Sequence, residues 1–161
     1  MSNKRAIIGL GNILRRDDGI GIAVLASLLS HYKRPGLEYL DFGIASFDLI
    51  YRLEGFNEVL LIDGIRASLV PGELKIFPLG QARYTLQGPP ISSHELNLQG
   101  LFQLSKKLKI KTKIYVAGIQ VKDISYGDSL SGELKKNLKE ITKEIAVFID
   151  RRLLKNKACV L

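Results

Sequence analysis

Apolar and polar residues alternate along this chain in blocks that predict strands and helices in turn. Arg5–Gly9 is a short apolar run typical of a strand, and Gly19–Tyr32 then carries apolar residues at helical spacing. Glu58–Ile65 is the most continuous apolar run and predicts a buried strand. Further strands are predicted at Leu37–Phe42, Gly72–Leu79 and Lys113–Ile119, and further helices at Phe47–Leu53, Glu95–Leu108 and Gly132 to about Leu154. This order predicts an α/β fold, a three-layer sandwich with a mostly parallel, partly mixed sheet flanked by helices.

Two segments without a clear period are expected to be loops. Gly80–Ser93 contains Gly88-Pro89-Pro90 and leads the chain to His94, and Gln120–Ser131 connects the last predicted strand to the last helix.

Length and composition indicate one ordinary globular domain spanning residues 1–161. Cys159 is the sole cysteine, which excludes an intramolecular disulfide and a cysteine-rich metal site and favours the cytoplasm. The N-terminus does not have the pattern of a secretory signal, and no apolar run approaches the roughly 18 residues of a membrane helix. We therefore expect a protein without a membrane span.

The formal net charge of +8 lies mainly in the last third of the chain, at Lys106–Lys113 and Lys135–Lys157. Much of this charge is interleaved with glutamate, which favours a solvated helix face, with an acidic protein partner as the main alternative. Nucleic acid is not expected as a partner, because no aromatic residues are interspersed to stack on bases.

The most informative segment is Gly9-Leu-Gly-Asn-Ile-Leu-Arg-Arg-Asp-Asp-Gly-Ile-Gly21, a glycine turn between the first strand and the first helix. Asp17 and Asp18 stand where that helix should begin. Helix N-termini favour anions, so this pair would repel a phosphate rather than help to bind one. Taken by itself, the pair is more often a helix cap than a metal site.

Three polar residues follow apolar elements directly: Asp18 after the first turn, Asp63 at the end of the third predicted strand, and His94 after the irregular segment. Ligands of open α/β sheets gather at the carboxyl ends of strands. Two carboxylates and an imidazole can chelate a divalent transition metal and leave positions open for substrate or water. Asp63 could also form a strand-end turn, and His94 could serve only as a hydrogen-bonding loop residue.

The order of several motifs makes the chain similar to the hydrogenase maturation endopeptidases, which process the large subunit of nickel-iron hydrogenases. The matching motifs are the glycine turn, Asp41-Phe-Gly-Ile-Ala-Ser46, Leu60-Leu-Ile-Asp-Gly64 and Ser92-Ser-His-Glu-Leu96. They span most of the chain. The sequence departs from many relatives at Phe42 and Ile44, and in Gly118-Ile-Gln-Val-Lys-Asp123, which implies a difference in substrate choice.

The resemblance implies an endopeptidase that removes the C-terminal extension of a large-subunit precursor after nickel has been inserted. It assigns Asp18, Asp63 and His94 to binding or sensing nickel, which the substrate's own active site would supply. The chain has no Gly-x-Ser-x-Gly elbow, and Cys159 lies in the tail. Nickel bound by the three residues would therefore orient the scissile peptide and polarise its carbonyl or a water, with Asp17 as a structural partner.

Two alternatives belong to other classes of protein. A dinucleotide-binding domain is suggested by Gly9-x-Gly11 after a strand and by Asp41 at the end of the next one, but Leu14 occupies the third glycine position. A non-catalytic adaptor in hydrogenase assembly would use its basic terminal helix for docking, and Asp18, Asp63 and His94 would then be structural.

Overall fold

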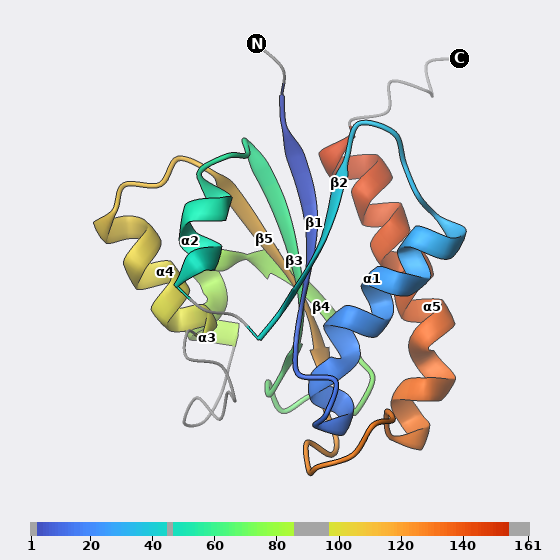
Figure 1. The fold of residues 1–161 in the computed structure, drawn as a ribbon. Coiled ribbons are helices and arrows are strands. Elements are labelled where there is room, and N and C mark those ends of the chain that lie inside the picture. Colours follow the sequence, from blue (N-terminus) through green and yellow to red (C-terminus); the bar gives the residue numbers. More distant parts are fainter. Residues whose placement is uncertain (1–2, 45–46, 86–96, 155–161) are drawn as a thin grey trace.

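The computed structural model describes residues 3–44, 47–85 and 97–154. The strands are β1 (Arg5–Leu10), β2 (Glu38–Gly43), β3 (Glu58–Ile65), β4 (Leu74–Pro78) and β5 (Lys113–Gln120). Within the described residues they form one five-stranded sheet in the order β2-β1-β3-β5-β4 (Figure 1). β1 pairs in parallel with β2 and β3, and β3 in parallel with β5, whereas the edge strand β4 is antiparallel to β5. The predicted mostly parallel, partly mixed sheet is confirmed.

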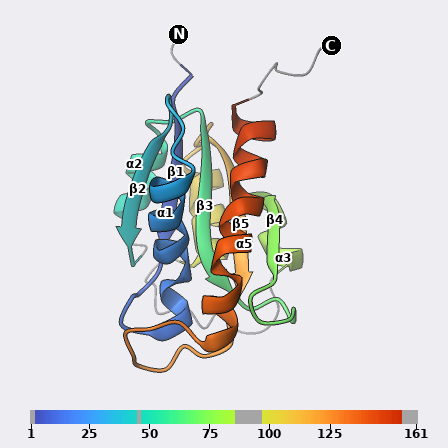
Figure 2. The same cartoon turned by 90° about the vertical axis from the view of Figure 1, so that its right-hand side faces the viewer.

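Helices cover both faces of the sheet. They are α1 (Ile20–His31), α2 (Asp48–Leu53), α3 (Ala82–Thr85), α4 (Leu98–Lys107) and α5 (Gly132–Phe148), and α5 continues as a π-helical segment at Ile149–Leu153. α1 and α5 lie on one face, and α2 and α4 lie on the other (Figures 1 and 2). This arrangement confirms the three-layer architecture.

Side-chain alternation within the strands divides the core into two halves. Ile7 and Leu60 pack with the apolar residues of α1 and α5, whereas the next residues, Ile8 and Leu61, pack with those of α2 and α4. Because both faces are covered, β1, β3 and β5 are almost wholly buried, which explains their continuous apolar sequences. In the part of the chain that is described, no helix is long and apolar enough to cross a bilayer.

One described segment differs from its prediction. Residues 80–85 were expected to be loop, but the chain forms a 3₁₀ turn at Leu79–Gln81 and then α3. Leu79 and Ala82 are buried in the core. A helix of four residues is too short to show a hydrophobic period, so the sequence pattern does not predict α3. Packing against the core stabilises this short helix instead.

The first turn of α1 lies directly against the ends of β1 and β3. A Cβ atom on Gly21 would be 2.2 Å from the carbonyl oxygens of both Leu10 and Ile62. Gly11 adopts a φ of 145°, and a Cβ there would lie 2.0 Å from the carbonyl oxygen of Asp18. Glycine is therefore required at positions 11 and 21, because a side chain at either position would keep the start of α1 away from the edge of the sheet.

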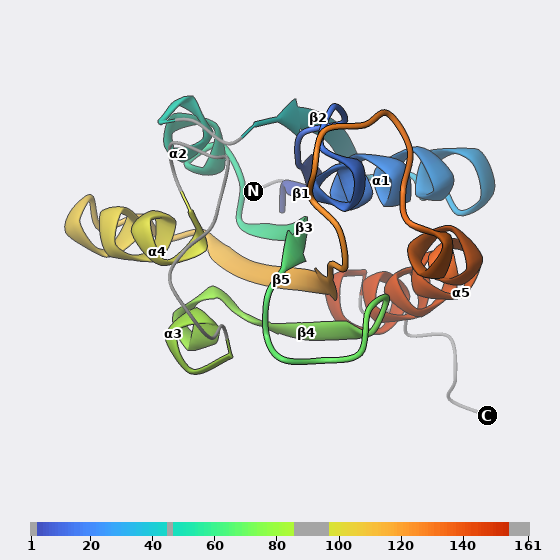
Figure 3. The same ribbon diagram turned by 90° about the horizontal axis from the view of Figure 1, so that it is seen from below.

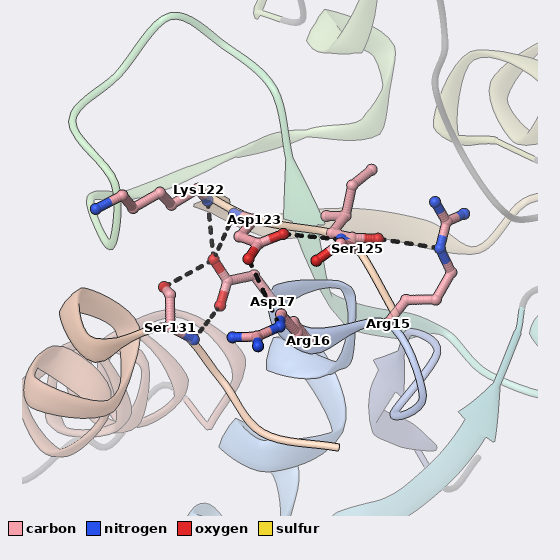
Figure 4. Close-up of polar contacts among 8 residues, drawn as sticks. Arg15, Arg16, Asp17, Lys122, Asp123, Ser125 and Ser131 are labelled. Carbon is pink, nitrogen blue, oxygen red and sulfur yellow. Dashed lines mark hydrogen bonds and ion pairs between the residues drawn. The ribbon is translucent and has the colours of Figure 1, made fainter. Parts of the chain in front are cut away.

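A buried carboxylate joins the two loops at this edge, the β1–α1 loop (residues 11–19) and the β5–α5 loop (residues 121–131). The Oδ2 atom of Asp17 accepts hydrogen bonds from the backbone N–H groups of Lys122 and Asp123, both at 2.9 Å, and from the Ser131 hydroxyl at 2.8 Å (Figure 4). Its Oδ1 atom accepts from the Ser131 N–H at 2.7 Å. Seen from below, the β5–α5 loop runs across the start of α1 (Figure 3). Asp17 therefore fixes the position of one loop against the other.

The Gly21→Ala variant should lower the free energy of unfolding by about 3 kcal/mol, because the methyl group has only backbone around it and the helix must move away from the sheet. Gly132→Ala is the matched control, since a Cβ there meets no heavy atom within 4 Å. We expect this control to change stability by less than about 1 kcal/mol, toward greater stability. Urea unfolding measures both, and equal stability of the two variants would contradict the close packing at Gly21.

The Asp17→Asn variant should lose about 3 kcal/mol of stability, because an amide NH₂ group would face N–H donors that now bind a carboxylate. Ser131→Ala removes only the hydroxyl and keeps the backbone donor, so it should cost about 1 kcal/mol. Chemical denaturation of the two variants tests this ranking. An Asp17→Asn protein as stable as the wild type would show that the carboxylate does not hold the loops together.

Candidate functional site

Asp18 and Asp63 both lie at the carboxyl edge of the sheet, where two neighbouring strands end. Asp18 is in the 3₁₀ turn Arg16–Gly19 that follows β1, and Asp63 is in the last third of β3. The side chains have low exposure, 8% for the residue Asp18 and 5% for Asp63. β1 lies between β2 and β3, so the chain runs from β1 to the strand on one side of it and then to the strand on its other side. Open α/β sheets bind ligands at the point where the strand order reverses in this way.

The electrostatic environment of Asp63 disfavours its ionised form. Its pKa is raised to about 8, first by burial and second by the negative charge of Asp18, while a hydrogen bond from the Gly64 backbone N–H lowers it. Asp63 lies beside Gly118 in the pairing of β3 with β5. Two carboxylates that interact in a buried site resist carrying two negative charges unless a cation joins them. The pair is thus chemically suited to a divalent metal ion.

The turn before Asp18 fixes the place of its carboxylate. The Asn12 backbone N–H donates to the Oδ2 atom of Asp18 at 3.2 Å, and the Asp18 N–H donates to the Arg15 carbonyl at 3.0 Å. The Asn12 side chain accepts a bond of 3.0 Å from the Leu14 N–H, which closes the same turn. Asp18 is therefore held by a rigid loop next to Gly11.

The expectation that Asp17 or Asp18 caps the first helix is wrong. The residue before α1 is Gly19, and no side chain accepts a capping bond there. The chain inserts the 3₁₀ turn between strand and helix, so both carboxylates precede the cap position. Asp17 is directed to the β5–α5 loop instead, and Asp18 stays at the sheet edge with Asp63.

The remaining predicted ligand, His94, lies outside the described residues. The other histidine, His31, is at the opposite end of α1, where its Nδ1 contacts the Ser27 carbonyl oxygen at 3.1 Å. The 12 residues of α1 separate it from the start of that helix, by about 18 Å at 1.5 Å per residue. His31 therefore cannot join Asp18 and Asp63. Over the described ranges, no group of three His, Cys, Asp or Glu residues is arranged to hold a metal ion.

Asp41 and Asp17 each hold a loop through hydrogen bonds. Asp41 accepts a bond of 2.9 Å from the Gly43 N–H, which forms a turn at the end of β2. The contact of Asp17 with Ser131 was not predicted in detail. It joins residues 114 positions apart, and only a serine directly before a predicted helix hinted at a polar group there.

Sequence comparison places most of the chain in one family. Residues 22–147 match the sequence profile of the HycI family, described as hydrogenase maturation protease. The hydrogenase expression/formation protein HoxM of Cupriavidus necator is 24% identical over 147 residues, which cover 89% of this chain and 73% of HoxM. The delta subunit of the coenzyme F420 hydrogenase of Methanothermobacter thermautotrophicus is 25% identical over 150 residues, covering 89% and 91% of the two chains.

Solved structures show the same fold. The hydrogenase maturating endopeptidase HybD from Escherichia coli superposes with a TM-score of 0.77 at 19% identity, over 92% of this chain and 93% of HybD. The HycI hydrogenase maturation protease from Thermococcus kodakarensis has a TM-score of 0.70 at 24% identity, with the same coverage of 92% and 93%. The profile match, which spans more than half of the chain, carries the assignment: this chain belongs to the hydrogenase maturation protease family.

Proposed function

We propose that this protein is the endopeptidase that removes the C-terminal extension of a nickel-iron hydrogenase large-subunit precursor once nickel has been inserted. The observation that carries this proposal is the pair of buried, electrostatically coupled carboxylates, Asp18 and Asp63, at the strand edge of a maturation-protease fold. His94 completes the proposed ligand set. The nickel is part of the substrate, and the protein needs none of its own.

The coupled pair suits a cation that arrives with the substrate. Without a cation, burial and the charge of Asp18 keep the pKa of Asp63 high, so this carboxyl group tends to hold its proton near neutral pH. A divalent ion offsets both negative charges and releases that proton. A precursor without nickel offers no such compensation, and its scissile bond is not positioned.

Cleavage then uses the metal as an electrophile. Nickel held by Asp18, Asp63 and His94 would polarise the scissile carbonyl or a bound water. The water oxygen adds to the carbonyl carbon, the peptide C–N bond breaks, and the leaving nitrogen takes the proton that this water gives up. Proximity supplies much of the rate, because the bond to be cut is brought beside the metal by the substrate's own fold.

The nickel-loaded precursor should be cleaved by the purified protein, and the nickel-free precursor should not. Intact-mass measurement of the large subunit follows loss of the extension. Asp18→Asn should reduce cleavage by at least about 100-fold, because it removes a charged ligand. Glu144→Gln, on the exposed face of α5, is the control and should leave the rate unchanged.

Each contrary result has a distinct meaning. Equal cleavage of both precursors would disprove the nickel requirement. Cleavage by the Asp18→Asn, Asp63→Asn and His94→Ala variants at the wild-type rate would remove these residues from the mechanism. Precursor binding without cleavage by the wild-type protein would favour the alternative of a non-catalytic adaptor in hydrogenase assembly.

The pH dependence of stability tests the environment of Asp63. Its pKa in the folded protein, about 8, lies above the reference value of 3.8. The stabilisation from this group is therefore complete below the lower value and is lost as the pH rises toward the upper one. Between pH 5 and pH 7 the loss should be about 3 kcal/mol.

The Asp63→Asn variant removes this titration. The difference in unfolding free energy, variant minus wild type, should therefore increase between pH 5 and pH 7. Urea unfolding at several pH values provides the comparison. A constant difference between the two proteins across this range would contradict the raised pKa.

A further inference from the structure

Three large apolar side chains stand exposed beside the proposed nickel site. Ile13 and Leu14 in the β1–α1 loop are 60% and 64% exposed, and Tyr126 in the β5–α5 loop is 85% exposed. The two loops are adjacent, since the Gly127 N–H donates to the Leu14 carbonyl at 3.0 Å and Arg15 forms a β-bridge with Gly127. We call these three residues the apical patch. Isolated exposed apolar residues are ordinary, but three of them on two loops that are hydrogen-bonded to each other indicate an interaction surface.

Hydrogen bonds hold the backbone under the apical patch in one conformation. The Arg16 N–H donates to the Gly127 carbonyl at 3.1 Å, and the Asp17 N–H donates to the Asp123 carbonyl at 3.0 Å. The Arg15 Nε–H adds a bond of 3.1 Å to the Ile124 carbonyl (Figure 4). Little conformational entropy is therefore lost when a partner covers these side chains, which favours binding.

The apical patch is continuous with the carboxylate site. The Asp18 backbone N–H donates to the carbonyl of Arg15, which is the residue that follows Leu14. A Cβ on Gly19 would lie 3.1 Å from the Cα of Ile13, so the patch rests on the turn that carries Asp18. A molecule that brings a metal ion to Asp18 must cover the apical patch or pass beside it.

The side-chain types match those of protein interfaces. The Arg15 guanidinium lies 5.7 Å from the ring centre of Tyr126, and Arg16 is 3.5 Å from the Asp123 carboxylate. Tyrosine and arginine are among the residues most enriched at the energetic centres of interfaces. Because Asp123 offsets the charge of Arg16, the surface is apolar with the Arg15 cation at its border. It fits an apolar partner surface with an acidic residue at its rim.

We infer that the apical patch is the docking surface for the folded body of the hydrogenase large-subunit precursor, beside its metal centre. The inference rests on the proposed function, because that function identifies the molecule that delivers nickel to Asp18. Docking of the folded body, and not of the C-terminal extension alone, places the metal and the scissile bond together at the carboxylates.

The test measures binding and cleavage separately, with the nickel-loaded precursor as the probe. Leu14→Ser and Tyr126→Ala should each weaken precursor binding and raise KM by at least about tenfold, with kcat unchanged. Leu14→Met and Tyr126→Phe keep the apolar surface and should retain near wild-type KM. Val147→Ser is the control, since Val147 is 40% exposed near the far end of α5.

Urea unfolding verifies that each variant is folded. If Leu14→Ser does not fold, Tyr126→Ala alone tests the inference. Unchanged binding and KM in the folded patch variants would overturn the inference. A wild-type dimer that the patch variants dissociate, with precursor binding intact, would overturn it in favour of contact with a second copy of this chain. A wild-type protein that binds the precursor without cleaving it would refute the proposed function alone, and loss of binding in the patch variants would still support docking.

Discussion

The close approach of the first turn of α1 to the ends of β1 and β3 is the constraint on which the rest of the site depends. It is possible because Gly21 leaves the carbonyl oxygens of Leu10 and Ile62 uncrowded and because Gly11 takes a φ of 145°. The chain must then form a compact turn between strand and helix, and that turn brings Asp17 and Asp18 to the sheet edge. Asp63 is already there because β3 lies next to β1.

Two neighbouring carboxylates have opposite roles in this arrangement. Asp17 is wholly buried but is surrounded by donors from the β5–α5 loop, so its charge is compensated and it stabilises the fold. The charge of Asp18 instead raises the pKa of Asp63 in a site that burial already makes unfavourable for ions. The Asp18–Asp63 pair therefore lowers the stability of the fold, as is common for residues that bind ligands or react. In the proposed function, a cation that belongs to the substrate would recover that loss, and this would link nickel content to productive binding.

The sequence was most informative where elements are long or buried on both faces. β1, β3 and β5 were predictable because their apolar residues form continuous runs. α1 and α5 were predictable because their apolar residues recur at helical spacing. α3 was not, because four residues are too few for a pattern. The helix cap was wrongly predicted at Asp17 or Asp18, because nothing local distinguishes a cap from a 3₁₀ turn that comes just before it. The bonds from Asp17 to residues 122–131 join distant parts of the chain, which single-sequence patterns cannot reveal. For the site, the order of motifs predicted Asp18, Asp63 and His94. The structure places Asp18 and Asp63 together at the sheet edge, their role toward nickel stays a prediction, and His94 lies outside the described residues.

The coupling of Asp18 to Asp63 is the central claim, and ¹³C NMR titration of the aspartate carboxyl carbons tests it most directly. In the wild-type protein the Asp63 signal should titrate with an apparent pKa near 8, the value to which burial and Asp18 raise it. In the Asp18→Asn variant this midpoint should fall, because one of its two causes is gone, and burial alone should keep it above the ordinary range of about 4. A wild-type midpoint near 4, or one that Asp18→Asn leaves in place, would contradict the account.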